Sequence, residues 1–239
     1  MMNVFNFTVS FFLFHLIHFW TLGLVFAFFD FQEGSHVLYQ FKVQKDKHNP
    51  LKMQDFWKCC RVVLKNQILV SLPMAVLLYF LLGCFGSTLE FDVFPSISKC
   101  VFHFTVFLAI EEVLFYHLHR MFHIPWFYRN FHKVHHEFKA PIAIASAYCA
   151  PLEHALVNLF PALVGPVIMG TDLYILSLWI FIGLTNTMLA HSGYDIPFLF
   201  SSRYHDFHHE YFMWNYGVLR FFDWFYRTDI RFKKHAKSS

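Results

Sequence analysis

Charged side chains are scarce in this chain. Of its 239 residues only 15% are Asp, Glu, Lys or Arg, whereas 56% are hydrophobic. An ordinary soluble domain carries about 25% charged residues, so this composition excludes that class and predicts a membrane protein. The net charge of +3 is small and the basic residues form no single face. Their scatter excludes a nucleic-acid-binding surface.

Cysteine is also scarce. No C-x-x-C spacing occurs among the five cysteines, which are Cys59, Cys60, Cys84, Cys100 and Cys149. This pattern argues against a disulfide framework and against a thiolate zinc site, so the thiols are expected to be free. The sequence also lacks a repeat with a period of about 20 to 50 residues. One compact unit is therefore expected for a chain of this length.

Apolar sequence, in contrast, is abundant and comes in long runs. Three runs predict membrane-spanning helices, and two further runs around a Gly-Thr-Asp turn predict a helical hairpin. The spans are residues 9–31, 64–85 and 98–115, and the hairpin arms are residues 152–169 and 173–190. A helix rises about 1.5 Å per residue and the hydrocarbon core is about 30 Å thick, so the longest run crosses it. The sequence predicts an all-α integral membrane bundle.

The basic residues indicate how this bundle is oriented. Seven lie in residues 42–65, four in residues 120–139 and seven in residues 203–237, which makes 18 of the 19. The expected topology places these three segments on one side of the membrane and only Lys99 on the other. Cytoplasmic loops carry the excess of Lys and Arg. We therefore expect a lumenal N-terminus, a cytosolic C-terminus and a loop or surface segment at residues 32–63.

Histidine is the other abundant polar residue. Eleven of the 17 histidines lie between positions 117 and 209. His119 and His123 are four residues apart, so both project from one face of a helix that Pro125 is expected to end. The spacing H-x-x-H-H then occurs twice, at His132, His135 and His136 and at His205, His208 and His209. Each group again places its imidazoles on one helical face.

Three such groups predict metal binding on the predicted cytosolic side. The candidate ligands are His119, His123, His132, His135, His136, His191, His205, His208 and His209. One tetrahedral zinc needs about four ligands, so nine imidazoles fit two metal ions better. Imidazole suits iron, copper, zinc and nickel, of which iron and copper readily activate oxygen. His117 lies outside the pairing and is expected to support the ligands. The isolated pair His15 and His18 is expected to be structural.

Carboxylates occur in the same segments. Four of them are candidates to accept the second ring N–H of a histidine ligand: Glu112, Glu137, Asp206 and Glu210. Glu111 and Glu112 lie near the end of the third apolar run, where an unpaired carboxylate is costly. At least one of the two is therefore expected to face the metal site. Glu112 and Asp206 are the candidate catalytic residues.

With their flanking residues, the histidine groups resemble the three histidine boxes of the fatty acid hydroxylase and sterol desaturase superfamily. Residues 111–123 resemble the first box, residues 132–141 the second and residues 204–209 the third. Residues 191–197 resemble the C4-methylsterol oxidases. Residues 161–170 and 216–219 resemble the fatty acid hydroxylase domain-containing proteins. The resemblance covers about residues 100–230.

This resemblance implies transmembrane helices capped by a cytosolic histidine-rich helical domain that holds two iron ions. It implies an oxygen-using hydroxylase of a sterol or fatty acyl lipid in the endoplasmic reticulum membrane. Electrons would come from NAD(P)H through cytochrome b5 or a reductase. The chain then divides into a membrane region at 1–97, a hydroxylase-like catalytic domain at 98–230 and a basic, solvated tail at 231–239.

One position departs from the family pattern. The family usually has a histidine immediately before the proline at position 151, and this chain has Ala150. The substitution leaves open a catalytically degenerate relative that acts as a lipid-binding or regulatory membrane protein. His154, four residues later, is a candidate to compensate. A metal transporter fits poorly, because the histidines gather at one surface instead of lining the spans.

Overall fold

The computed structural model describes residues 2–32, 34, 36–45, 47, 50–91, 93–199 and 201–238. Within these ranges the regular structure is helical, apart from one isolated antiparallel bridge between Lys42 and Tyr194. Four helical segments in this part of the chain are long and apolar enough to cross a membrane. The expected all-α membrane bundle is confirmed. Of the predicted tail, Ser239 lies outside the described residues.

Two long helices form one side of the bundle. The first is α1 (Val4–Asp30). The second is continuous over 32 residues and consists of α2 (Met53–Asn66), the π-helix η2 (Gln67–Ser71) and α3 (Leu72–Cys84). It begins eleven residues before the predicted span, inside the segment expected to be a loop. The reason is that α2 is amphipathic and buries Phe56, Cys59 and Val63 along one face.

The π-helix in this long helix coincides with a proline. Pro73 stands at the start of α3, immediately after η2. Proline has no backbone N–H and its ring clashes with the preceding turn of an α-helix. A single widened turn relieves that clash without ending the helix. The predicted second span therefore remains continuous across its proline.

The predicted hairpin is confirmed on the other side of the bundle. Its first arm consists of α6 (Pro151–Glu153), the π-helix η5 (His154–Leu159) and α7 (Phe160–Ile168), and its second arm is α8 (Leu173–His191). Gly170 turns the chain between them with φ +52°. A Cβ there would lie 2.3 Å from the carbonyl oxygen of Phe85. The absence of a side chain at Gly170 therefore allows the hairpin turn to pack against the end of α3.

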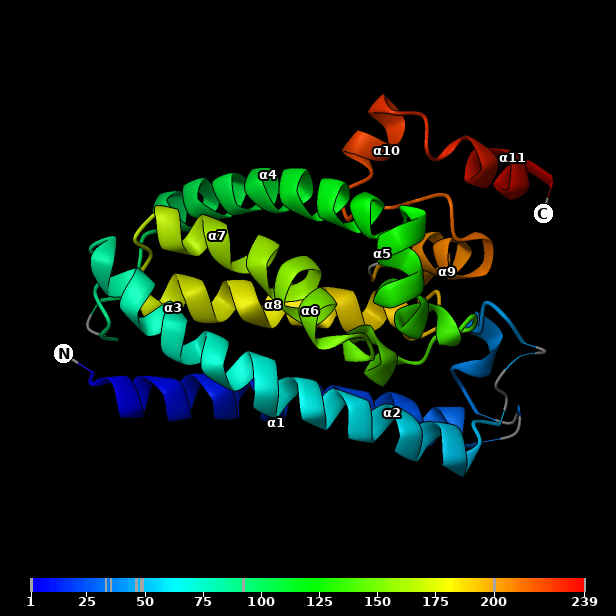
Figure 1. Ribbon diagram of the computed structural model, residues 1–239, viewed down its shortest axis with the longest axis horizontal. Coiled ribbons are helices and arrows are strands. Elements are labelled where there is room, and N and C mark those ends of the chain that lie inside the picture. The colour runs from blue at the N-terminus through cyan, green and yellow to red at the C-terminus, as the bar shows by residue number, and fades with distance from the viewer. Residues whose placement is uncertain are drawn as a thin grey trace.

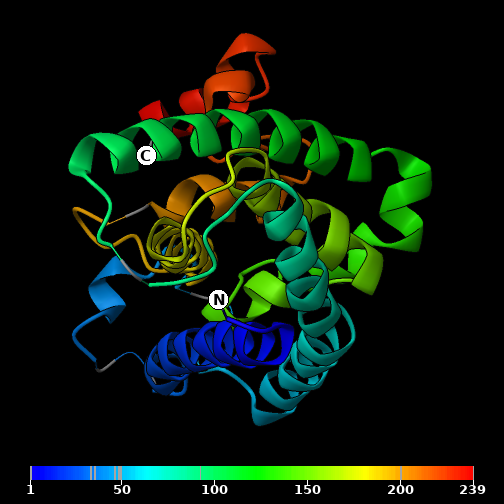
Figure 2. The same cartoon turned by 90° about the vertical axis from the view of Figure 1, so that its left-hand side faces the viewer.

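The expected third span lies in α4 (Ile97–Phe122), which lies across one side of the bundle, inclined to α8 (Figures 1 and 2). It packs most closely on α7, where a Cβ on Gly165 would lie 2.9 Å from the ring of Phe107. The four apolar segments do not include α4. Its sequence carries charged residues and histidines on several turns, which lower its hydropathy. Among the described residues, four segments are thus apolar enough to cross a membrane, and the predicted third span is not one of them.

The histidine-rich segments gather at one end of the bundle. They are the 3-10 helix η3 (His132–Glu137) and α9 (Ser202–Tyr211), with the ends of α4 and α8. Short elements without clustered histidines accompany them: α5 (Pro125–Asn130), the 3-10 helix η4 (Ala143–Ala147), α10 (Phe221–Phe225) and α11 (Ile230–Ser238). Figure 1 shows this end together with the α1–α2 connection, which contains η1 (Tyr39–Phe41). The N-terminus and the α3–α4 and α7–α8 connections lie at the opposite end. The three basic segments thus share one end with the histidines.

Two features of this end differ from expectation. The group His132, His135 and His136 lies on a 3-10 helix and not on an α-helix. The predicted tail forms α11, whose Phe232 ring lies 5.0 Å from the ring of Tyr204 and 5.4 Å from that of Phe207. The start of the tail therefore packs on α9 through an apolar contact. The prediction of a solvated tail rested on its basic residues and missed this contact.

Candidate metal centre

The structure brings all nine predicted ligands together at this end, in two groups. The first group contains His119, His123, His132, His136 and His208, and the second contains His135, His191, His205 and His209. One ring nitrogen of each residue lies within 4.8 Å of those of the other members. Rings of the two groups also touch, because the centroids of His136 and His209 are 4.8 Å apart. Each group has the composition and spacing to hold a metal ion.

Local structure explains how each group is assembled. His119 lies on the last turn of α4, and His123 caps that helix because Pro125 begins α5. On α9 the i, i+3, i+4 spacing turns three imidazoles inward, as predicted. His191 is the last residue of α8. The ligands therefore come from helix ends and short helices that the packed bundle holds in place.

The spacing of the ring nitrogens fits a shared cation. Nitrogens bound to one metal at about 2.0–2.1 Å lie about 2.9–3.4 Å apart when the angle between them is about 90–109°. In the first group, the Nε2 atom of His132 is 2.8 Å from that of His123 and 3.0 Å from that of His136. In the second group, the Nε2 atom of His191 is 3.3 Å from that of His135 and 2.9 Å from that of His205. The Nε2 atoms of His205 and His209 are 3.2 Å apart. The imidazoles thus stand at ligand spacing.

Hydrogen bonds to backbone carbonyls set the tautomers. The Nδ1–H of His119 donates to Tyr216 at 2.8 Å, and that of His208 donates to Trp214 at 2.7 Å. A carbonyl oxygen can only accept, so the proton is on Nδ1 and the lone pair of Nε2 faces the group. His135 and His191 make the same kind of bond, to the carbonyls of Tyr148 and Thr187. These four rings are oriented as ligands.

Buried ring nitrogens without a partner complete the test of fit. His208 is fully buried, and its Nε2 atom has no hydrogen-bond partner; the Nδ1 atoms of His123 and His136 also have none. An unpaired buried polar atom is costly. A cation bound there would supply the missing partner to Nε2 of His208. The donor set consists of imidazoles, which favours a transition metal over magnesium or calcium.

Glu153 is a functional residue that the sequence did not reveal. Its carboxylate is buried and accepts a hydrogen bond of 2.6 Å from the Nδ1–H of His132. This contact orients His132 and raises its basicity as a ligand. A carboxylate ahead of an apolar run is costly in a membrane unless it has a partner. The sequence thus indicated that Glu153 needs a partner, but it did not indicate that this partner is His132.

We expect Glu153→Gln to lower metal affinity by about 10- to 100-fold, because partners of metal-binding histidines contribute that much. Competition against a chelator measures the affinity. Glu137→Gln is the matched control, since Glu137 is half-exposed and pairs with Lys58 and Tyr148 instead of a histidine. Equal affinities in the two variants would contradict the role of Glu153.

The four carboxylates predicted to contact ligands have other partners among the described residues. Glu112 is buried and accepts backbone N–H bonds from Leu219 at 2.8 Å and Phe221 at 3.1 Å. Glu210 pairs with Lys47 at 3.7 Å. Glu137 has the partners named above. Main-chain carbonyls instead accept from four of the ligand rings and Glu153 accepts from His132, which corrects the predicted supporting contacts.

Asp206 lies between two ligands in sequence but on another face of α9. Its Oδ2 atom accepts a hydrogen bond of 2.9 Å from Gln44, and Oδ1 is buried without a partner. Burial raises the pKa of Asp206 to about 7, the Gln44 hydrogen bond opposing this rise. The contacts of Glu112 and Asp206 are those of positioning groups. Their catalytic roles stay predictions.

Several other histidines lie outside both groups. His117 is exposed and its Nδ1–H donates to the carbonyl of Val113 at 2.7 Å. His154 uses both ring nitrogens, one with Ser71 at 2.9 Å and one with Asn158 at 3.3 Å, so it does not replace a missing ligand. Neither group includes Ala150. Four or more nitrogens assemble in each group without a histidine at that position.

Burial also controls the protonation of the ligands. It lowers the pKa of His135 to about 4, and it lowers the pKa of His136 and His208 well below the ordinary value. The imidazoles are therefore neutral near pH 7, as metal binding requires.

This shift predicts acid sensitivity of the metal-free protein. The folded-state pKa is depressed, so the unfolded chain binds more protons at acidic pH. The stability that neutral histidines contribute is complete above about pH 6.5 and declines as the pH falls towards 4. We expect the thermal midpoint of metal-free protein to fall through this window. A midpoint unchanged from pH 7 to pH 4.5 would contradict burial of the cluster.

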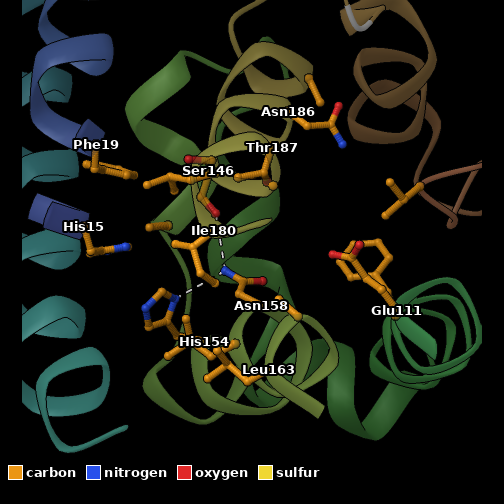
Figure 3. Close-up of a pocket in the computed structure, with 18 of the residues that line it drawn as sticks. His15, Phe19, Glu111, Ser146, His154, Asn158, Leu163, Ile180, Asn186 and Thr187 are labelled. Carbon is orange, nitrogen blue, oxygen red and sulfur yellow. Dashed lines mark hydrogen bonds between the residues drawn. The ribbon is translucent and has the colours of Figure 1, made fainter. Parts of the chain in front are cut away.

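Next to the second group, a cavity with a volume of about 250 Å³ lies between the helices (Figure 3). His191 and His205 form part of its wall. Apolar side chains line most of the remainder, including Phe19, Leu163 and Ile180. Glu111 also lines the cavity, but neither Glu111 nor Glu112 belongs to a histidine group, so a position of one of them at the metal site stays a prediction. A mostly apolar cavity thus adjoins the second histidine group.

Known proteins share this sequence pattern. A family model described as fatty acid hydroxylase matches residues 104–228. Fatty acid hydroxylase domain-containing protein 2 of Homo sapiens is 36% identical over 218 residues, which cover 91% of this chain and 65% of that protein. A fatty acid hydroxylase of Mycosarcoma maydis is 36% identical over 229 residues, covering 92% of this chain and 59% of its own length.

A third relative is covered more fully. Methylsterol monooxygenase 1 of Danio rerio is 31% identical over 222 residues, which cover 89% of this chain and 73% of that protein. The chain spans less than two thirds of the length of the two hydroxylase relatives. No solved structure matches. The matches include all three histidine segments.

Proposed function

The chain belongs to the fatty acid hydroxylase family, and on this premise we propose that it is an iron-dependent, oxygen-using hydroxylase or oxidase of a sterol or another membrane lipid. The observation that carries this proposal is the apolar cavity whose wall includes His191 and His205. A lipid that enters from the bilayer would present a C–H bond to the second histidine group there. Sites of this kind are concave, mostly apolar and fitted with a few polar groups.

The nine histidines would hold two iron ions, five imidazoles serving one and four the other. When bound, the irons would supply activation of dioxygen, which protein side chains alone cannot perform. The chain itself would contribute binding and orientation. Glu153 and the carbonyl groups of Tyr216 and Trp214 hold the ligand rings, and the surrounding apolar walls exclude water from the reacting lipid.

Electrons would come from NAD(P)H through cytochrome b5 or a reductase at the endoplasmic reticulum membrane. The support is that the basic segments and the histidine groups share one end of the bundle, which the distribution of Lys and Arg assigns to the cytosol. Donor, compartment and orientation form part of this proposal. A catalytically degenerate relative remains the alternative suggested by Ala150, and the two complete groups of imidazoles weigh against it.

Lipid profiling of cells with and without the protein tests the function and names the substrate together. We expect one lipid class to accumulate without the protein and its oxidised product to disappear. The purified chain should then oxidise that lipid only when oxygen, NAD(P)H, cytochrome b5 and its reductase are all present. Unchanged lipids, or no turnover in the complete mixture, would contradict the proposal.

A further inference from the structure

A group of polar side chains interrupts the apolar wall of the cavity. This polar cluster consists of His15, Ser71, Ser146, His154 and Asn158. Its members come from four elements that are distant in sequence, α1, η2, η4 and η5. Figure 3 shows His15, Ser146, His154 and Asn158 around one part of the cavity, with Glu111 on the other side. The metal function described above does not use these five side chains.

The internal hydrogen bonds of the cluster can be counted atom by atom. The Nδ2 atom of Asn158 donates to the carbonyl of Ser146 at 3.4 Å, which fixes the orientation of the amide because a carbonyl only accepts. The same amide nitrogen lies 3.3 Å from Nδ1 of His154, which must therefore accept. His154 then carries its proton on Nε2 and donates to Ser71 at 2.9 Å. Both of its nitrogens are used.

The other members of the cluster can each form further hydrogen bonds. Ser71 accepts from His154, which leaves its own proton free to donate. The Ser146 hydroxyl is buried and has no partner. Among the described residues, no hydrogen bond reaches the imidazole of His15 or the Oδ1 atom of Asn158. The cluster thus offers both donors and acceptors beside the cavity. Unpaired polar groups are costly at membrane depth and usually serve a ligand.

The charges around the cavity define the chemistry of that ligand. In the described part of the chain, Arg220 is the only Lys or Arg among the lining residues, and its guanidinium lies 4.2 Å over the ring of Tyr204. Glu111 lines the same cavity and would oppose an anion. The polar cluster itself contains no Lys or Arg, so a carboxylate or phosphate held there would lack a cationic partner. A neutral hydroxyl group, which can donate one hydrogen bond and accept two, matches the cluster.

We propose that the polar cluster recognises a neutral hydroxyl group of the lipid and so selects substrates that already carry an alcohol. This inference rests on the proposed function for the identity of the occupant as a substrate. The binding preference itself does not depend on turnover or on metal. A sterol and a long-chain alcohol share the required chemistry, and the experiment separates them.

Two matched probe pairs test the proposal on the purified full chain in detergent. The first pair is a photoreactive sterol with a free ring hydroxyl and its methyl ether, and the second is a photoreactive long-chain alcohol and its methyl ether. In at least one pair, the free hydroxyl should bind about five- to tenfold more tightly, the difference made by one neutral hydrogen bond. The pair that shows this difference identifies the lipid class.

Variants then test whether the polar cluster causes the preference for the free hydroxyl. Asn158→Leu and, on a separate helix, His15→Phe should each reduce the difference to less than about twofold. Asn186→Leu is the matched control, because Asn186 lines the same cavity outside the cluster and should preserve the difference. Elution as a single species shows that each variant is folded. Two cluster variants are used so that a folding defect in one leaves the other as the test.

Three results would overturn the inference: equal binding of alcohol and ether in both pairs, no binding of any probe, or an unchanged preference in a folded cluster variant. These results are separable from failure of the proposed function. Preference for the alcohol without any lipid turnover would support the cluster and contradict the enzyme. Turnover without that preference would do the reverse.

Discussion

Replacing His208 with alanine should abolish lipid oxidation, by more than about a hundredfold, while the protein still inserts into the membrane. His208 is fully buried in the first histidine group, with Nδ1 bonded to a carbonyl and Nε2 facing the other rings. Even the supporting partners of metal-binding histidines contribute about 10- to 100-fold, so a lost ligand should cost more. Turnover of the identified lipid measures the effect, and metal analysis should show loss of one ion.

His117→Ala is the control for this variant. His117 lies in the same histidine-rich stretch, but it is exposed and belongs to neither group. The control should keep both its metal content and its rate. Membrane extraction under identical conditions establishes that each variant is inserted. A full rate in His208→Ala would show that the first group is not the metal site.

The second large effect concerns stability. Lys42→Met should destabilise the protein by about 3–5 kcal/mol, because it leaves Asp30 as a buried charge without its partner. The side chains of Asp30 and Lys42 are 0% and 5% exposed and form an ion pair. The Tyr194 hydroxyl donates to the same carboxylate at 2.9 Å. This contact ties the end of α1 to the segment that follows His191. The denaturant midpoint of the solubilised chain measures the loss.

Two further variants isolate the cause. Adding Asp30→Asn to Lys42→Met removes the uncompensated charge and should recover part of the stability. Lys58→Met breaks an exposed pair with Glu137, whose side chains are 56% and 40% exposed, and should cost less than about 1 kcal/mol. Equal losses in Lys42→Met and Lys58→Met would contradict the importance of burial.

The sequence was sufficient to predict which histidines gather, because close spacing keeps them near one another along the chain. All nine predicted residues lie in the two groups, although each H-x-x-H-H segment contributes to both groups, which its spacing did not predict. Glu153 was missed because its partner His132 is 21 residues away and only the folded chain brings them together. The opposite error occurred at Asp206, which adjoins His205 in sequence but contacts Gln44.

The fold was predictable to a similar degree. Long apolar runs identified the membrane helices, because hydropathy averaged over a span is a strong signal. The average did not reveal the start of α2, because the apolar residues of that helix occupy only one face. It also led to the prediction of a membrane span at residues 98–115, although α4 carries several charged residues and histidines. The 3-10 geometry at His132–Glu137 is not visible in the spacing of its histidines, which is the same as that on the α-helix α9.

The central claim is that this chain holds two metal ions in two groups of histidines, and elemental analysis of the purified full-length chain tests it most directly. We predict about two iron ions per chain, falling to about one in His208→Ala and in His135→Ala. A chain that carries a single ion, or no stoichiometric transition metal, would contradict the claim.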